Sequence, residues 1–384
     1  MSSTHAKPGG GSSYIPGLDG IRAIAFMTVF MAHASPPGIS FYVPATLGVT
    51  IFFFLSGYLI TTLLRKEFGR TGGISLKDFY IRRALRILVP LYIVYGLAEL
   101  VGRYVSHAGG GTLAGFVSTV FYYFNYGYAL GGSYGIGLNI YAPPGLSVIW
   151  SLCIEEHFYL LFPMVFLALN RSRLSRRARM FWLVGFCVLE LAWRSFRVLA
   201  HFRGNSTWNY YATDARLDSI LWGAVLAMFF NPMLGDRRIL PKRGQAWVFG
   251  TAVVALVLSL GIRGELYRDA LRYSVQAVLL LVCFSFVISR IDHWSVRWLE
   301  WPVVRYIGWT SYTLYLCHYM VLETIDKLAP MSWPARMALG LVLSVAFASA
   351  MRYAVELPLQ RLRGRFRRVP ERDPTAADGH GLVS

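Results

Sequence analysis

The feature that most constrains this chain is a series of continuous apolar runs, each about as long as a membrane-spanning helix. Such a helix needs roughly 20 predominantly apolar residues. A transmembrane barrel would instead show many alternating segments of about ten residues. The sequence therefore predicts an all-α integral membrane protein, a polytopic bundle of about ten transmembrane helices. The predicted spans are 16–36, 46–64, 87–105, 149–169, 180–199, 214–230, 246–262, 271–289, 307–327 and 336–355.

Composition supports the same class. The chain is 55% hydrophobic and 15% charged, whereas soluble domains carry about 25% charged residues. Its net charge of +18 would suggest a nucleic-acid ligand in a soluble protein. Here the basic residues form short clusters between apolar runs, so we expect contact with membrane lipid and no nucleic-acid partner. The four cysteines lie inside apolar runs without paired spacing, which predicts neither a disulfide nor a metal site.

The basic clusters also predict how the chain is oriented. The segments 65–86, 171–179, 231–243, 290–305 and 352–372 hold 26 of the 38 lysines and arginines. Ten spans place all five segments on one side of the membrane. The positive-inside rule makes that side cytoplasmic, so the sequence predicts a multi-pass protein with both termini in the cytoplasm.

One further apolar segment, 113–130, would invert every later loop if it were counted as a span. Its aromatic residues and glycines favour a re-entrant or interfacial segment on the outer side. We therefore expect a flexible N-terminus at 1–14, a transmembrane domain at 15–360, and a basic, disordered cytoplasmic tail at 361–384.

Two ionisable residues of the first span share one helical face. Arg22 and His33 are eleven residues apart, close to three helical turns, and so roughly 16 Å apart along the axis. Asp19 precedes Arg22 by three residues and can pair with it. This layout suits a long ligand with a phosphorylated head near Arg22 and a reactive end near His33. The alternative is a snorkelling interfacial arginine and a core histidine hydrogen-bonded to a neighbouring helix.

Arginines of the cytoplasmic segment 77–90 form a second candidate site. Arg83 and Arg86 are three residues apart, the spacing of helix neighbours, and guanidinium groups at a helix start can grip phosphate oxygens. Clusters that follow the positive-inside rule look the same without binding a ligand. The spacing alone leaves both readings open.

Three further residues lie within predicted spans and have an ionisable side chain. Glu155 lies near the outer end of its span, where it could orient an imidazole on another helix or simply interact with the helix dipole. Arg216 lies between Asp214 and Asp218, which favours a structural ion pair. His318 lies mid-helix and fits a satisfied core histidine as well as a catalytic one.

Six motifs in a fixed order extend over most of the chain. With these motifs, residues 14–360 resemble the membrane-bound acyltransferase family 3, bacterial integral-membrane O-acyltransferases that modify envelope glycans and some secondary metabolites. The motifs are GLDGIRAIA, FFFLSGYLI, RRALRILVPLY, WSLCIEEHFYLLFP, RLDSILWG and SYTLYLCH.

The resemblance implies a role for individual residues. His33 matches the catalytic histidine, Arg22 the arginine of the same motif, and Glu155 the glutamate of the Trp-Ser-Leu motif. Arg83 and Arg86 match an arginine pair associated with the acyl-CoA donor. Asp19, Arg216, Asp218 and His318 are then candidates for supporting roles.

The resemblance also implies an activity and a place for it. We expect acyl transfer, most simply of acetyl, from cytosolic acyl-CoA as co-substrate to a hydroxyl of an extracytoplasmic glycan, a lipid-linked glycan or a metabolite. The expected location is the bacterial inner (cytoplasmic) membrane, with no bound cofactor or metal. Whether His33 acts as general base or takes the acyl group itself is open.

The resemblance also bears on a possible further domain and on the alternative class of a transporter. Some family members carry a fused extracytoplasmic esterase-like domain, and no Gly-Asp-Ser motif follows the last span here. We therefore expect a membrane-domain-only member that uses its acceptor directly or a separate extracytoplasmic transferase. The alternative class is a transporter or flippase of an envelope precursor, whose buried Arg, His and Glu would line a solute path. The arginine pair in 77–90 favours the enzyme, because a transporter needs no grip on CoA.

Overall fold

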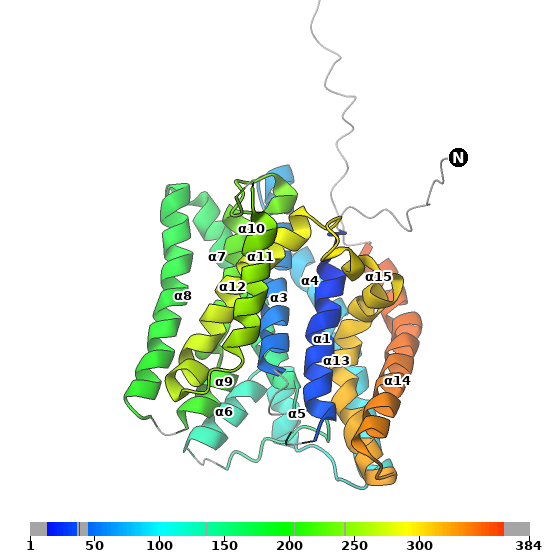
Figure 1. Ribbon diagram of the computed structural model, residues 1–384. Helices are drawn as coiled ribbons and strands as arrows, with labels where there is room; N and C mark the ends of the chain where they lie inside the picture. Colours follow the sequence, from blue (N-terminus) through cyan, green and yellow to red (C-terminus); the bar gives the residue numbers. More distant parts are fainter. Residues whose placement is uncertain are drawn as a thin grey trace, which may run out of the picture.

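The computed structural model describes residues 14–36, 38, 45–134, 137–202, 204–241 and 243–364, and these residues form helices without any strand (Figure 1). The α-helices are α1 (Leu18–Ala34), α3 (Ala45–Thr71), α4 (Leu76–Leu100), α5 (Leu113–Val120), α6 (Phe124–Tyr134), α7 (Ile149–Arg171), α8 (Arg176–Leu199), α9 (Asn205–Tyr211), α10 (Leu217–Phe229), α11 (Gln245–Ser259), α12 (Arg272–Ser289), α13 (Pro302–Leu328), α14 (Trp333–Met351) and α15 (Leu357–Gly364). Short π or 3-10 turns are η1 (Val101–Val105), η2 (Thr213–Ala215), η3 (Pro232–Leu234), η4 (Tyr267–Leu271), η5 (Arg297–Glu300) and η6 (Arg352–Glu356).

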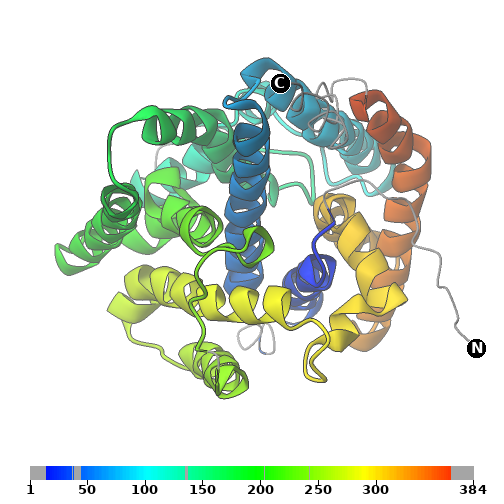
Figure 2. The same ribbon diagram turned by 90° about the horizontal axis from the view of Figure 1, so that it is seen from above.

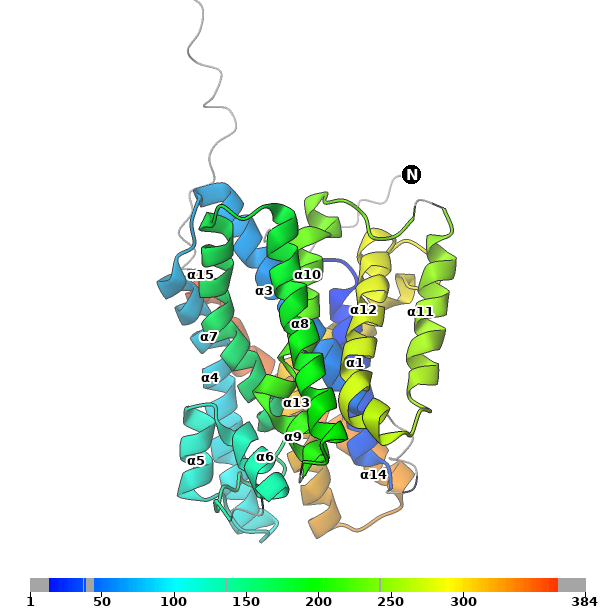
Figure 3. The ribbon, with the colours of Figure 1, turned by 90° about the vertical axis from the view of Figure 1, so that its left-hand side faces the viewer.

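Length and composition alone identify six helical segments of the described chain that can cross a membrane. They are Ala45–Thr71, Leu76–Val105, Ile149–Arg171, Leu217–Leu234, Tyr267–Ser289 and Trp333–Leu362. The other four predicted spans correspond to α1, α8, α11 and α13, which run alongside these segments in the bundle (Figures 1 and 3). The chain is therefore a membrane protein with several spanning helices.

Helix α3 forms the centre of the bundle (Figure 2). In its most apolar stretch 72% of the residues are buried, against 22% in the segment that contains α14. Helices at the periphery expose large apolar side chains, among them Phe181 and Trp182 of α8, Leu258 of α11 and Val342 of α14. Surfaces of this kind are suited to lipid. We therefore interpret the exposed apolar faces of these peripheral helices as surfaces that contact membrane lipid.

Close contact between α3 and α10 depends on two glycines. A Cβ added to Gly57 would lie 1.9 Å from the carbonyl oxygen of Ile220, and one added to Gly223 would lie 1.9 Å from that of Phe54. The two helix backbones therefore touch directly, as small residues allow in membrane bundles. This contact fixes the position of α3, whose other face lines the pocket described below.

Helix α4 starts earlier than its apolar run. Its first residue is Leu76, and the Ser75 hydroxyl accepts a hydrogen bond from the Asp78 amide at 3.3 Å, a capping interaction. Arg83 and Arg86 thus lie within the helix, whereas the sequence analysis places them in a segment before the span at 87. Hydropathy locates the apolar boundary, but the cap and the helix-forming residues decide where the helix begins.

The chain between α4 and α7 contains two short helices. Within 113–130 the structure has α5 and the first part of α6, at the end of the bundle opposite the start of α1 (Figure 1). That the segment 113–130 is re-entrant or interfacial stays a prediction. Helix α15 extends from Leu357 to Gly364, and the predicted domain boundaries stay a prediction. Residues 1–13 and 365–384, which hold most of the predicted flexible termini, lie outside the described residues.

Candidate active site

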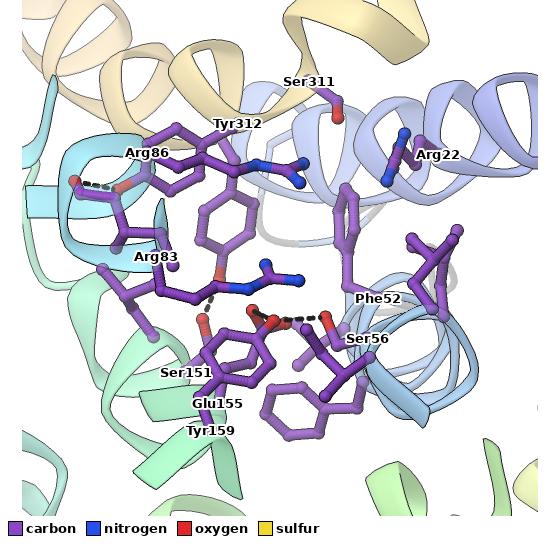
Figure 4. Close-up of a pocket in the computed structure, with 18 of the residues that line it drawn as sticks. Arg22, Phe52, Ser56, Arg83, Arg86, Ser151, Glu155, Tyr159, Ser311 and Tyr312 are labelled. Atoms are coloured by element: carbon purple, nitrogen blue, oxygen red, sulfur yellow. Dashed lines mark hydrogen bonds between the residues drawn. The ribbon is translucent and has the colours of Figure 1, made fainter. Parts of the chain in front are cut away.

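A pocket in the middle of the bundle brings together four of the nine predicted site residues, namely Arg22, Arg83, Arg86 and Glu155. Helices α1, α3, α4, α7 and α13 form its walls (Figure 4). We call it the arginine pocket, and its empty volume, counted to the open mouth, is about 830 Å³. It is lined by Arg22, Val49, Phe52, Phe53, Leu55, Ser56, Leu59, Ile60, Arg83, Arg86, Ile87, Ser151, Leu152, Glu155, Tyr159, Ser311, Tyr312, Tyr315 and Leu316.

Three guanidinium groups converge on this pocket from two sides. Arg83 and Arg86 reach it from α4, and Arg22 reaches it from α1 (Figure 4). Arg83 lies over the Tyr159 ring, with its central carbon 4.9 Å from the ring centroid. Within the described part of the chain, neither Arg83 nor Arg86 forms an ion pair with a carboxylate. Their positive charge is therefore available to an anionic ligand.

The predicted pair of Asp19 with Arg22 is present. A guanidinium nitrogen of Arg22 donates to the Asp19 carboxylate at 2.7 Å, and the Trp309 indole donates to the other carboxylate oxygen at 2.5 Å. Asp19 thus fixes the orientation of Arg22 and also links α1 to α13. Because the two residues are one turn apart on the same helix, sequence spacing was enough to predict this contact.

A second cavity opens beside the first at the end of the bundle where α1 begins. We call it the mouth cavity, and it shares Arg22, Leu59, Arg83, Arg86 and Tyr312 with the arginine pocket. The two cavities are thus continuous. The mouth cavity is also lined by the carboxylates of Asp19 and Glu356, and it adds a lysine, an arginine and a tryptophan. Those residues are Lys66, Arg352 and Trp309.

Glu155 lies within the arginine pocket rather than beside His33. The Tyr159 hydroxyl donates to its carboxylate at 3.0 Å, and the same hydroxyl lies 2.9 Å from the Ser56 hydroxyl (Figure 4). The sequence analysis leaves open whether Glu155 orients an imidazole on another helix, and in the structure the ring of His33 has a different hydrogen-bond partner. Glu155 and Tyr159 are four residues apart on α7 and therefore share the helix face that lines this pocket.

The hydrogen-bond partner of His33 is His318, from the middle of α13. His33 Nδ1 and His318 Nε2 are 2.8 Å apart, and the two rings are inclined by 18°. His318 is fully buried, and its Nδ1 lies 2.8 Å from the Tyr315 carbonyl oxygen. The Tyr319 ring packs against His33 at a centroid distance of 4.7 Å. Two histidines that are 285 positions apart in sequence thus form one hydrogen-bonded pair.

Arg336, which the sequence analysis does not identify, holds the end of α1 that carries His33. Its guanidinium donates to the carbonyl oxygens of His33 and Ala34 at 3.1 and 2.8 Å, and it forms an ion pair with Asp326 at 2.5 Å. Cations at a helix C-terminus satisfy carbonyls that have no partner within the helix. No motif marked this residue, because its partners come from α1 and α13.

The expected ion pair of Arg216 with a neighbouring aspartate is absent from the described structure. Asp218 is instead paired with Arg194 of α8 at 2.7 Å, and both side chains are fully buried. Arg216 is buried as well, with its central carbon 3.9 Å from the centroid of the Tyr273 ring and a guanidinium nitrogen 3.4 Å from the Thr50 hydroxyl. The prediction was wrong because a residue on another helix competes better for Asp218.

Taken together, the described residues form a basic opening, an apolar pocket wall and, on the other side of Tyr315, a histidine pair in which His318 is fully buried. Apolar side chains such as Phe52, Leu59 and Ile87 line the arginine pocket between its charged groups. Tyr315 contributes its ring to this pocket and its carbonyl oxygen to the hydrogen bond with His318. An elongated anionic molecule with an apolar arm therefore fits the combined shape and charge.

Comparison with known proteins gives a consistent result. The family described as "Acyltransferase domain" matches residues 15–353. "Putative peptidoglycan O-acetyltransferase YrhL" of Bacillus subtilis strain 168 is 31% identical over 375 residues, 93% of this chain and 57% of that protein. "O-acetyltransferase OatA" of Staphylococcus aureus strain NCTC 8325 is 29% identical over 331 residues, 82% of this chain and 51% of that protein. No solved structure matches the chain.

The match to the family extends over most of the described bundle, including every residue of the arginine pocket and both histidines. The chain spans about half the length of the curated relatives it matches. This protein belongs to acyltransferase family 3.

Proposed function

We propose that this protein transfers an acyl group, most simply acetyl, from cytosolic acyl-CoA to a hydroxyl of an extracytoplasmic carbohydrate. The observation that supports this most strongly is the arginine pocket, in which Arg83 and Arg86 have no carboxylate partner among the described residues. The names of the relatives support O-acetylation as the reaction type. Family membership does not favour the alternative of a transporter or flippase.

The proposed donor enters through the mouth cavity. Its phosphates would meet Arg22, Arg83 and Arg86, whose guanidinium groups can hold phosphate oxygens by paired hydrogen bonds. The pantetheine arm and acyl group would then follow the apolar wall toward the histidine pair. Glu155, bonded to Tyr159, would hold the pocket side chains in place and balance part of the arginine charge.

In this proposal His33 is the general base. Its ring nitrogen takes the proton of the acceptor hydroxyl while the oxygen forms a bond to the acyl carbon. The carbon–sulfur bond of the thioester breaks, and CoA leaves as a thiolate that takes up the proton. Acyl transfer through His33 itself would be the covalent variant of the same scheme.

Ten crossings complete the proposal for membrane topology. Helices α1, α8, α11 and α13 would cross together with the six segments identified by length and composition. The positive-inside rule then places both termini and the mouth cavity on the cytoplasmic side of the bacterial inner membrane. The segment with α5 and α6 would lie on the outer side, where the carbohydrate, free or lipid-linked, arrives. A separate extracytoplasmic transferase could receive the acyl group there.

Release of free CoA thiol from acetyl-CoA tests this function. Membranes that contain the protein are supplied with envelope glycan extract, and His33→Ala and Arg83→Gln are compared with Arg70→Gln. Arg70 is exposed and near the same end of the bundle, outside both cavities. We expect release that depends on the extract, disappears in His33→Ala, weakens at low donor concentration in Arg83→Gln, and is unchanged in Arg70→Gln. Release that persists in His33→Ala would contradict the proposed mechanism.

A further inference from the structure

A chain of hydrogen bonds runs from the backbone of α13 through His318 to His33. His318 Nδ1 lies 2.8 Å from the Tyr315 carbonyl oxygen and 3.2 Å from that of Leu314. Its other nitrogen, Nε2, lies 2.8 Å from His33 Nδ1. The ring planes are inclined by only 18°, and centroids as far apart as 5.1 Å with the two nitrogens at 2.8 Å place the contact edge to edge, along the direction of the nitrogen lone pair.

These contacts determine where the protons are. A carbonyl oxygen can only accept, so the hydrogen of the first bond belongs to His318 Nδ1. In a neutral imidazole the other nitrogen, Nε2, then carries the lone pair and accepts. His33 Nδ1 must therefore donate, which leaves the lone pair of His33 on its Nε2.

The surroundings exclude a doubly protonated His318. Its side chain is fully buried and is flanked by the rings of Phe26 and Phe30, at centroid distances of 5.9 and 6.3 Å. Within the described residues no carboxylate forms an ion pair with it, and the charged group that is hydrogen-bonded to the pair is the cationic Arg336, which donates to the His33 carbonyl oxygen. A buried imidazolium without a counter-ion is strongly unfavourable.

We propose that His318 is a positioning residue, which holds His33 in the tautomer that presents an unprotonated Nε2 to the acceptor hydroxyl. This inference rests on the proposed function, and it gives His318 the imidazole-orienting role that the sequence analysis considers for Glu155. When His33 takes up a proton, the hydrogen bond to His318 Nε2 becomes charge-assisted and therefore stronger. The Tyr319 ring packs against the His33 ring, inclined to it by 31°, and limits its rotation.

Substitutions at His318 separate positioning from a structural role. In His318→Leu the volume is nearly kept but the acceptor is lost, so we expect kcat to fall on the order of 10²-fold, a typical general-base contribution, with KM for acetyl-CoA little changed. In His318→Gln an amide oxygen can accept from His33 and the amide nitrogen can donate to the backbone, so we expect at least part of kcat to return. His293→Leu is the control, since the His293 ring is hydrogen-bonded to Ser295 at 2.9 Å and lies outside the pair.

The proposal would be overturned if kcat fell equally in His318→Leu and His318→Gln. It would also be overturned if a folded His318→Leu protein kept a kcat near the wild-type value. The double variant His33→Ala/His318→Leu should be no slower than His33→Ala, because both changes remove the same contribution. A wild-type protein without any CoA release would instead refute the proposed function. The two failures are thus distinguishable.

The tautomer itself can be measured without activity. ¹⁵N-histidine is incorporated into the full chain in lipid nanodiscs, and loss of a signal in His33→Ala assigns that residue among the eight histidines. We expect the proton of His33 on Nδ1 in wild type and a shift toward protonated Nε2 in His318→Leu. A wild-type His33 protonated on Nε2 would overturn the proposal, whatever the kinetic result.

Discussion

Replacement of Gly57 by alanine tests the backbone contact between α3 and α10. The new Cβ would lie 1.9 Å from the Ile220 carbonyl oxygen, whereas real Cβ contacts are essentially never under 3.0 Å, so the helices must separate by at least 3.0 − 1.9 = 1.1 Å. Overpacking of this kind costs about 1–3 kcal/mol, and a backbone oxygen, which cannot rotate away, places the change near the upper value. The better helix propensity of alanine offsets about 0.5–1 kcal/mol. A net loss of about 2 kcal/mol remains.

Thermal unfolding in detergent measures this loss. A thiol-reactive fluorophore reports unfolding, because all four cysteines are buried in the folded chain. At roughly 2–4 °C per kcal/mol, the apparent Tm of Gly57→Ala should fall by about 4–8 °C. The control is Gly96→Ala on α4, where an added Cβ meets no atom within 4 Å. An equal Tm for the two variants would refute the direct contact between α3 and α10.

Substitutions at three other contacts test their contribution. Arg194→Met leaves Asp218 buried without its cation and should destabilise the protein by about 3–5 kcal/mol, whereas Arg194→Met combined with Asp218→Leu should lose less, as thermal unfolding would show. Burial raises the pKa of Asp236, but hydrogen bonds from Arg65 at 2.5 and 3.2 Å outweigh it and lower the pKa below 3.8. Its stabilisation is therefore present above pH 3.8 and lost as the pH falls through the lowered value, so Asp236→Asn should flatten the acid side of the Tm–pH curve. Arg336→Gln removes donors to two carbonyl oxygens at the end of α1. Backbone amide hydrogens there should exchange faster than in wild type, which hydrogen–deuterium exchange followed by mass spectrometry would measure.

Features that depend on local sequence could be predicted directly. The apolar runs identify the long helices, because each spanning helix satisfies its own backbone hydrogen bonds and its length must match the bilayer. The pair of Asp19 and Arg22 follows from their spacing within one helix. Family motifs point to His33, Arg83 and Arg86, but motif order gives no distance between these side chains. Local patterns thus define the elements and the types of site residue.

Partner choice between helices was decided only by the tertiary structure. His33 meets His318, and Asp218 meets Arg194, in each case a residue of another helix. Such contacts depend on the rotation of each helix about its axis and on how closely the backbones approach. For α3 the approach is set by Gly57, which brings its backbone against α10. Periodicity shows which residues share a face, but packing of the whole bundle selects which faces meet.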